Sequence, residues 1–332
     1  MTPRLVFVDL RHGRFCRMDA PSVPTVLCLG NFDGVHVAHA ALLREGVRLK
    51  ACLSPDARCG VFCFFRPSVD FFGDACGKEG MHLSSLREKL RLFAAEGVDF
   101  ACLCDFPSVR GLSPDEFMDM LAESVGCRGV VCGYNYRFGA CAKGTADMIA
   151  ARFDRPEAGL ACTVMPRLDV DGETVSSSRI RVLLREGDVS SAARLLGRRY
   201  AVESTVVHGK RLGRKMGFPT ANQHFLKENL VPRYGVYATL CHTPAGTLAG
   251  VSNVGVRPTV EGGDRGLVRA NCETHIMGVD QDLYGQRIRV EFVEFLREEK
   301  RFESVEALSA AIADDAGRAL TLVAHLIEAK SK

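Results

Sequence analysis

Two short segments of this 332-residue chain combine residue types that can hold a phosphate group. The first segment runs from Gly209 to Asn222, includes four Lys or Arg residues, ends in Phe-Pro-Thr-Ala-Asn, and carries three evenly spaced glycines, Gly209, Gly213 and Gly217. Glycines let the backbone approach phosphate oxygens closely, so that amide groups can donate to them. The Thr220 hydroxyl and the Asn222 carbonyl are hard oxygen ligands of the kind that Mg²⁺ accepts. A basic, glycine-rich turn between two strands is the alternative interpretation.

The second segment is a loop that follows an apolar run and precedes a helical pattern. It reads Gly30, Asn31, Phe32, Asp33, Gly34, Val35 and His36, and a second histidine follows at His39. The amide groups and the dipole at the start of a helix favour a phosphate. Histidines three apart share one helix face, so both imidazoles could donate to one phosphate group as its charge grows. Two ordinary surface histidines, or a metal pair without its other ligands, are the alternatives.

These two segments resemble signatures of the bifunctional prokaryotic riboflavin kinase/FAD synthetase family. The glycine-rich segment is similar to the riboflavin kinase signature, and the loop at Gly30 is similar to the opening of the nucleotidylyltransferase domain with its His-x-Gly-His pattern. Two further strings, Gly133–Gly139 and Val175–Arg181, resemble other elements of the first domain, and Glu273-Thr-His275 resembles part of the second. The resemblance covers nearly the whole chain.

Three positions depart from the family patterns. Ala38 stands where the family has glycine between the histidines, Ser178 replaces a threonine but keeps the hydroxyl, and Phe65-Arg66 stands where the family usually has Pro-His.

The resemblance implies two reactions that use ATP. In the C-terminal half, Glu273 would accept the proton of the riboflavin 5′-hydroxyl as that oxygen attacks the γ-phosphorus, with Thr220 and Asn222 holding Mg²⁺. In the N-terminal half, the phosphate of FMN would attack the α-phosphorus of a second ATP, so no general base is needed. The residues implied to act on the nucleotide there are His36, His39 and Arg181 as catalytic groups, with Gly30 to Gly34, Asn135, Ser177 and Ser178 as contacts.

Two of these assignments have strong alternatives. An arbitrary strand glutamate such as Glu273 usually points to solvent. Arg297 is expected to approach the flavin, although a surface ion pair with Glu294 or Glu298 explains it as well.

Composition fits such an enzyme without identifying it. Apolar residues make up 47% of the chain, and the net charge of +3 is too small for the basic stripe of a nucleic-acid-binding protein. The 14 cysteines are scattered and form no CxxC pair, which favours reduced, buried thiols and a cytoplasmic location. No stretch approaches the roughly 18 apolar residues of a membrane span, so we expect no membrane partner. Because of the small net charge, we also expect no nucleic-acid partner.

The predicted secondary structure follows a different pattern in each half of the chain. Apolar runs alternate with helical patterns up to about residue 186, which predicts an α/β domain with a Rossmann-like parallel sheet over 1–186. The expected strands are 26–29, 60–65, 100–104, 129–132 and 161–165, and the expected helices are 42–50, 83–96, 114–125, 146–153, 179–186 and 189–196. Because ligands bind beyond the carboxyl ends of such strands, Gly30 and Gly133 should line one crevice.

Residues 187–332 instead show successive strand-like runs with glycine or proline turns. The expected strands are 200–207, 235–240, 247–254, 269–276 and 287–295, with one or two closing helices over 305–326. This pattern indicates a small antiparallel barrel, and the family resemblance implies six strands.

The sequence therefore predicts an enzyme that makes FMN from riboflavin and FAD from FMN. The alternatives are a riboflavin kinase with an impaired N-terminal domain, or a flavin-binding regulatory module without turnover.

Overall fold

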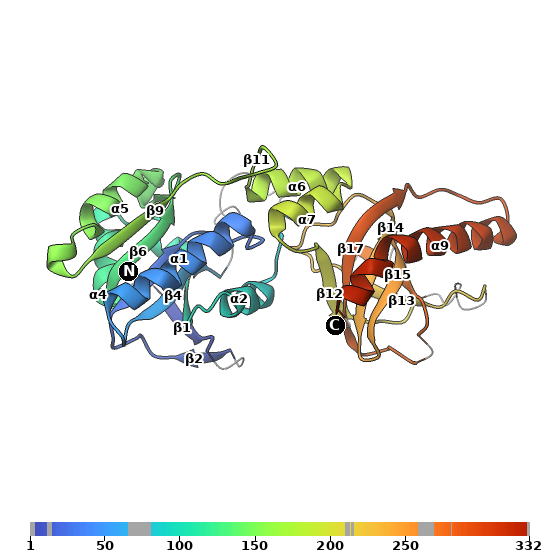
Figure 1. The fold of residues 1–332 in the computed structure, drawn as a ribbon, viewed down its shortest axis with the longest axis horizontal. Helices are drawn as coiled ribbons and strands as arrows, with labels where there is room; N and C mark the ends of the chain where they lie inside the picture. The colour runs from blue at the N-terminus through green and yellow to red at the C-terminus, as the bar shows by residue number, and fades with distance from the viewer. Residues whose placement is uncertain are drawn as a thin grey trace. The chain divides into compact units, whose positions relative to one another are not determined.

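The computed structural model describes residues 4–11, 15–65, 81–209, 213, 216–257, 269–279 and 281–330 (Figure 1). The chain forms two compact units: an N-terminal unit of residues 1–78 and 84–177, and a C-terminal unit of residues 79–83 and 178–332. The contacts thus divide the main chain between Ser177 and Ser178, whereas the sequence places the domain boundary after the helix that follows. Arg66 at the third departure, and the four basic residues of the glycine-rich segment, Lys210, Arg211, Arg214 and Lys215, lie outside the described residues.

A seven-stranded sheet with the order β2-β1-β5-β4-β3-β6-β9 forms the centre of the N-terminal unit. Its strands are β1 (Leu5–Asp9), β2 (Cys16–Met18), β3 (Thr25–Leu29), β4 (Arg58–Phe64), β5 (Phe100–Cys104), β6 (Cys127–Gly133) and β9 (Ala161–Met165). The five strands from β5 to β9 are parallel, which confirms the predicted Rossmann-like sheet. The antiparallel edge formed by β1 and β2 is absent from the sequence-based prediction.

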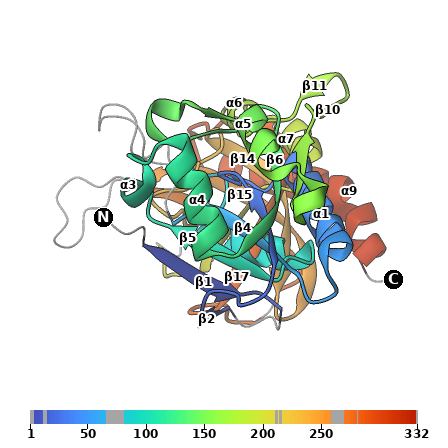
Figure 2. The same ribbon diagram turned by 90° about the vertical axis from the view of Figure 1, so that its left-hand side faces the viewer.

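Helices cover both faces of this sheet, and each face has its own apolar core. The helices are α1 (Val37–Leu53), α2 (Leu86–Ala95), α3 (Phe106–Val109), α4 (Pro114–Ser124) and α5 (Ala146–Phe153). Alternate residues of β3 point to opposite faces: Val26 packs with α1 and α2, while Leu27 packs with α4 and α5. Figure 2 shows the sheet lying between α1 and α4. Apolar side chains on both faces of its strands are typical of a parallel sheet.

Shorter elements complete the N-terminal unit. They are β7 (Arg137–Phe138), η2 (Ala140–Ala142), β8 (Gly144–Thr145), η3 (Pro156–Ala158), β10 (Asp169–Val170) and β11 (Glu173–Thr174). The predicted helix start at residue 83 is wrong by three residues. The reason is that the Ser85 side chain accepts from the Glu88 amide at 3.2 Å and caps α2, which begins at Leu86.

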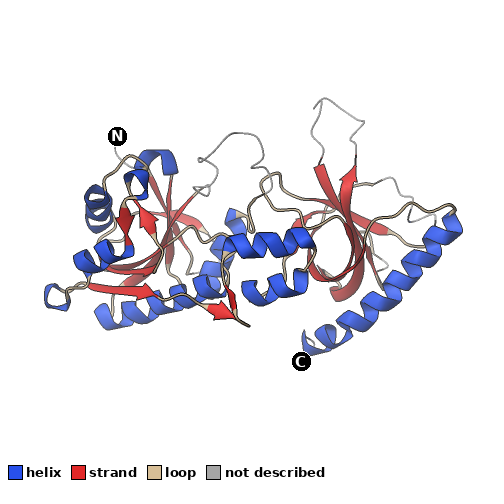
Figure 3. Cartoon of the chain, turned by 90° about the horizontal axis from the view of Figure 1, so that it is seen from above, coloured by secondary structure: helices blue, strands red, loops and turns tan. Residues whose placement is uncertain are grey.

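A six-stranded antiparallel sheet with the order β12-β17-β14-β15-β16-β13 forms the C-terminal unit (Figure 3). The strands are β12 (Ala201–Thr205), β13 (Thr220–His224), β14 (Gly235–Thr243), β15 (Gly246–Arg257), β16 (Arg269–Ile276) and β17 (Arg287–Arg297). The Val207 amide donates to the Asn222 carbonyl at 2.8 Å, so the two edges nearly close. The predicted six-stranded barrel is confirmed, and β13 is the strand that the sequence pattern did not indicate.

Three helices accompany the barrel: α6 (Ser177–Glu186), α7 (Val189–Leu196) and α9 (Val305–Lys330). The buried Ala319 and Val323 of α9 pack on β14 and β15, so this one helix closes the unit as predicted. His82 forms a parallel bridge with Asn229, which attaches residues 79–83 to the same unit. Over the described residues, none of the helices has the length and apolarity needed to cross a membrane.

Candidate active sites

The loop from Gly30 to His36 leaves the sheet at a point where strand order reverses. Leu29 at the end of β3 pairs with Cys132 near the end of the parallel strand β6, although helices and strands separate them in sequence. Ligands of doubly wound sheets bind beyond the carboxyl ends of the strands at such a reversal. The loop at Gly30 and the string that begins at Gly133 therefore lie at the same edge of the sheet, as the sequence predicts.

The loop has an unusual backbone and is fixed from inside the unit. Phe32, Gly34 and Val35 have φ values of 48°, 81° and 40°, in the left-handed region. The Phe32 ring is fully buried and packs 5.4 Å from the Phe93 ring, centroid to centroid. Ser177 Oγ donates to the Asp33 carbonyl at 2.8 Å, and Ser84 Oγ accepts from the Gly34 amide at 3.1 Å. Buried contacts therefore hold a strained turn at the start of α1.

The two histidines lie together at the N-terminus of α1. The His36 Nδ1 atom caps the helix by accepting from the His39 amide at 3.3 Å. The two rings stack with their centroids 3.6 Å apart and their planes 11° apart. Because Nδ1 of His36 is an acceptor, the ring hydrogen of its neutral form belongs on Nε2, which can donate to a ligand. The first turn of α1 has no acidic residue, so the helix dipole there favours an anion.

His39 is held in its neutral form. Burial lowers its pKa well below 6.5, and the neighbouring His36 and Lys89 lower it further. Its Nδ1 atom is buried without a hydrogen-bond partner among the described residues. His39 can therefore take part in ligand binding as a neutral group over the physiological pH range.

The remaining predicted contacts of the first site are less closely gathered. Asn135 is exposed in the turn after β6, where the Tyr136 amide donates to the Gly133 carbonyl at 2.9 Å. Ser178 is exposed at the start of α6. Arg181 belongs to the C-terminal unit, where its Nε donates to the Met81 carbonyl at 2.8 Å. The structure thus brings His36, His39 and the loop together with Ser177.

In the C-terminal unit, strand pairing places the predicted site residues side by side. Asn222 of β13 lies opposite Glu273 of β16, so both side chains leave the same face of the sheet. A third residue joins them: Asn271 Nδ2 donates to Glu273 Oε1 at 3.0 Å and to Asn222 Oδ1 at 3.4 Å. Asn271 and Asn222 are 4% and 5% exposed, so this polar group is fixed beneath the surface. The sequence analysis assigned no role to Asn271.

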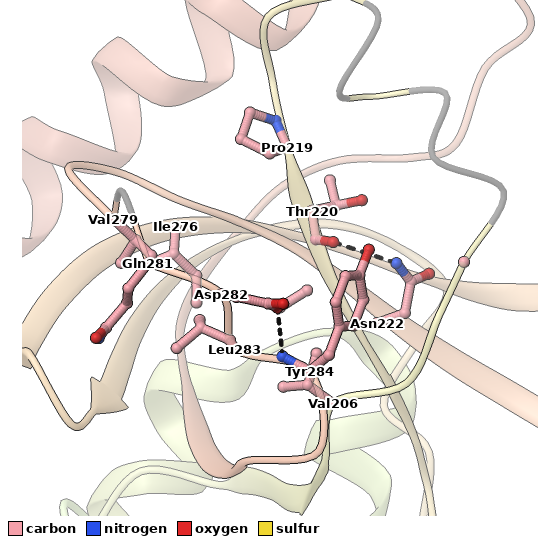
Figure 4. Close-up of a pocket in the computed structure, with 12 residues that line it drawn as sticks. Val206, Pro219, Thr220, Asn222, Ile276, Val279, Gln281, Asp282, Leu283 and Tyr284 are labelled. Atoms are coloured by element: carbon pink, nitrogen blue, oxygen red, sulfur yellow. Dashed lines mark hydrogen bonds between the residues drawn. The ribbon is translucent and has the colours of Figure 1, made fainter.

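A pocket of about 450 Å³ opens beside this group. Its wall contains Gly209, Thr220 and Asn222, together with Asp282 and Tyr284 from the segment after β16 (Figure 4). The Tyr284 amide donates to Asp282 Oδ1 at 2.9 Å, which fixes this segment. Three of the predicted residues therefore line one cavity.

Of the three glycines, Gly209 makes the closest approach to this site. A Cβ atom added to Gly209 would lie 2.5 Å from Asn222 Nδ2, so a larger residue there would displace the Asn222 side chain. Gly217 has a φ of 82°, and Gly213 accepts hydrogen bonds from the Met216 and Phe218 amides, as in a tight turn.

Comparisons with known proteins agree with both halves. Residues 19–179 match the FAD synthetase family, and residues 196–323 match the riboflavin kinase family. The chain is 35% identical over 302 residues to the bifunctional riboflavin kinase/FMN adenylyltransferase of Pseudomonas fluorescens, covering 90% of this chain and 93% of the relative. The corresponding protein of Escherichia coli K12 is 36% identical, with coverages of 89% and 92%. This chain belongs to the bifunctional riboflavin kinase/FMN adenylyltransferase family.

A solved structure also resembles the whole chain. The crystal structure of a macrolide-efflux protein from Streptococcus pneumoniae superimposes with a TM-score of 0.77 at 26% identity, covering 92% of this chain and 95% of that chain. The likeness supports the described fold of both units.

The family's implied metal can be tested against the residues present. Over the described residues, no group of three or more His, Cys, Asp or Glu side chains is arranged to hold a metal ion. Thr220 and Asn222 instead offer two uncharged oxygens in the pocket wall. This donor set fits Mg²⁺, which binds through few protein ligands together with substrate phosphates and water.

The family resemblance also led to the expectation that Arg297 contacts the flavin. Its guanidinium forms a bidentate pair with Asp315 of α9, with Nη2 donating to Oδ2 at 2.8 Å and Nε donating to Oδ1 at 3.2 Å. Asp315 is 2% exposed. The alternative of a side-chain ion pair with Glu294 or Glu298 is wrong, because Asp315 is the acidic partner and only the Glu298 carbonyl is contacted.

The departure at Ala38 introduces no backbone strain. Ala38 lies in the first turn of α1 and is absent from the residues with positive φ, so its position does not require glycine for conformational reasons.

Proposed function

We propose that the C-terminal unit transfers the γ-phosphate of ATP to riboflavin and that the N-terminal unit transfers AMP from a second ATP to the FMN produced. The observation that carries this proposal is the pairing of Asn222 with Glu273 beside the pocket, in a chain that also has the stacked His36 and His39 at a helix start. The family relationship supports both activities.

In the kinase reaction, Glu273 accepts the proton of the ribityl 5′-hydroxyl as its oxygen attacks the γ-phosphorus and ADP leaves. Asn271 orients the carboxylate by donating to Oε1 at 3.0 Å. Thr220 and Asn222 would hold Mg²⁺, which neutralises phosphate charge when it is bound. The glycine-rich segment positions the phosphates, because phosphoryl transfer depends mainly on positioning and charge stabilisation.

In the adenylyl transfer, a phosphate oxygen of FMN attacks the α-phosphorus of ATP and pyrophosphate leaves. The nucleophile is already ionised, so the site needs donors rather than a base. His36 Nε2, the dipole of α1 and the loop at Gly30 supply them, and Arg181, Asn135, Ser177 and Ser178 remain proposed nucleotide contacts.

We also propose a cytoplasmic location and no nucleic-acid partner. All 13 described cysteines are free and nine of these are buried, which fits a reducing compartment. The net charge of +3 supplies no strong attraction for nucleic acid.

The decisive experiment incubates the full chain with riboflavin, ATP and MgCl₂ and separates the flavins by chromatography over time. Parallel reactions start from FMN, and others replace MgCl₂ with EDTA. We expect FMN followed by FAD, and neither product with EDTA. FMN that accumulates without FAD, including in the reaction started from FMN, would restrict the function to the kinase. Riboflavin binding without ATP consumption would favour a regulatory module.

A further inference from the structure

Helix α2 supports the loop at Gly30 through two side chains that lie one turn apart. Lys89 Nζ donates to the Asn31 carbonyl at 3.2 Å, and the Phe93 ring packs edge-on against the Phe32 ring. Residues i and i+4 share one face of a helix, so a single face of α2 supplies both contacts. This face fixes the part of the loop that precedes the histidines.

The burial of Lys89 is unusual for a lysine. Its side chain belongs to a residue that is 3% exposed, whereas lysines are almost never fully buried unless they are paired. Within the described residues, its ammonium has the Asn31 carbonyl as its one hydrogen-bond partner and forms no ion pair with a carboxylate. An ammonium has three donor hydrogens, so two remain for another acceptor.

A buried charge with one neutral partner is costly unless another group compensates it. The neighbouring structure shows which kind of group this is. Lys89 binds the first residues of a loop that leads into the N-terminus of α1, where the helix dipole and His36 already favour an anion. A polyphosphate at this site would supply the missing negative charge.

We propose that Lys89 is a positioning residue for adenylyl transfer, holding the Asn31 carbonyl inward and placing a fixed positive charge beneath the loop that receives the ATP polyphosphate. The inference rests on the proposed function of the N-terminal unit. Three residues of the loop have φ values in the left-handed region, which is an unfavourable backbone conformation. The hydrogen bond from Lys89 to the Asn31 carbonyl helps to maintain this conformation. The contribution of Lys89 to the low pKa of His39 agrees with a charge close to the histidine pair.

The test compares two variants of Lys89 in the full chain. Lys89→Met removes the donor and the charge, while Lys89→Gln keeps an N–H donor without the charge. Leu90→Ala weakens the apolar packing of the same helix, and Arg91→Met removes a positive charge from its exposed face. The kinase reaction of each variant reports whether the C-terminal unit is intact.

We expect Lys89→Met to lower kcat/KM for ATP in FAD formation about 100-fold, as for a small misplacement of reacting groups, and Lys89→Gln to lower it about 10-fold. Kinase activity should stay within about twofold of the wild type, because the altered residue is in the other unit. The pKa of His39, measured by NMR, should rise in both Lys89 variants and stay unchanged in Leu90→Ala and Arg91→Met.

Two results would overturn the inference. One is FAD formation by both Lys89 variants no slower than by Leu90→Ala; the other is a His39 pKa that does not respond to loss of the Lys89 charge. Failure of the wild type to form FAD would instead refute the proposed adenylyl activity. The His39 titration needs no turnover, so it distinguishes the two failures even if Lys89→Met folds poorly and only Lys89→Gln is usable.

Discussion

Glu273 lies within a hydrogen-bonded group of side chains rather than standing as an isolated carboxylate. Asn271 donates to Oε1 of Glu273 and, through the same nitrogen, to Oδ1 of Asn222. One buried amide therefore links the proposed base to the proposed metal ligand. The hydrogen bond from Asn271 restrains the Glu273 side chain to one conformation, whereas an exposed glutamate would sample many rotamers.

Replacing Glu273 with glutamine should abolish proton acceptance and leave the shape of the site nearly unchanged. We expect Glu273→Gln to lower kcat of riboflavin phosphorylation by about 10²- to 10⁴-fold, the usual contribution of a general base. FAD formation from supplied FMN should remain at the wild-type rate. Both rates can be measured by chromatography, with Glu203→Gln on β12 as the control for loss of a carboxylate. A Glu273→Gln enzyme that phosphorylates riboflavin normally would exclude Glu273 as the base.

His39 makes the stability of the N-terminal unit depend on pH. Its pKa is lowered in the folded state, so below about pH 6.5 the unfolded chain binds a proton that the folded chain does not. This contribution to stability is fully present above pH 6.5 and decreases as the pH falls toward the lowered folded-state pKa. The slope should approach about 1.4 kcal/mol for each pH unit within that window.

Hydrogen exchange of α1 and β3 amides between pH 5 and pH 8 can measure this dependence after correction for intrinsic exchange rates. The His39→Gln variant should show a smaller loss of opening free energy below pH 6.5 than the wild type. Equal slopes for the two proteins would contradict the assignment of this pH dependence to His39.

At the scale of elements, the sequence predicts the strands whose own residues form an apolar pattern. It does not predict a strand that is buried only through its pairing partner. The strands β3 to β6 are apolar runs that are buried on both faces, and their pattern is visible without the fold. Strand β13 reads Thr-Ala-Asn-Gln-His, a sequence with no apolar alternation, and it is buried because it pairs with β16. Tertiary contact alone makes it a strand. The predicted site residues were found through family resemblance, whereas Asn271 and Lys89 became evident only through their contacts.

An ion pair with a buried carboxylate adds to the apolar packing between β17 and α9. Arg297 and Asp315 are joined by three hydrogen bonds, and Asp315 is 2% exposed. We expect Arg297→Met to destabilise the C-terminal unit by about 3–5 kcal/mol, because it leaves a buried carboxylate without its partner. The double variant Arg297→Met/Asp315→Leu should recover most of this loss. Denaturant unfolding of the two variants and the wild type measures both effects.

The same variants address the expected flavin contact. If Arg297 acts only through α9, the double variant should regain riboflavin phosphorylation along with its stability. A stable double variant with a strongly raised KM for riboflavin would instead support contact between Arg297 and the flavin.

At the scale of the whole molecule, the two units have different sheet types but share one feature, which is their buried thiols. Nine described cysteines are buried. Seven lie in strands of the N-terminal sheet, four toward one face and three toward the other, and two lie in the barrel: Cys102, Cys104, Cys127 and Cys132; Cys28, Cys59 and Cys63; and Cys241 and Cys272. The Cys28 and Cys59 sulfurs are 4.0 Å apart, well beyond the roughly 2 Å of a disulfide bond. These thiols pack as small apolar groups in both units.

Burial should make these thiols unreactive, because the thiolate is the nucleophile and burial disfavours it. Burial raises the pKa of Cys63 to about 11 and that of Cys241 to about 12. At pH 7.5 we expect a maleimide to label the exposed Cys16, Cys52 and Cys141 within minutes and the buried cysteines only as fast as each unit opens. Mass spectrometry of the labelled peptides locates the modified residues, and labelling in denaturant controls for reagent access. Because labelling of Cys63 reports the N-terminal unit and labelling of Cys241 the barrel, unequal rates would show that the units open separately, whereas immediate labelling of either residue would contradict its burial.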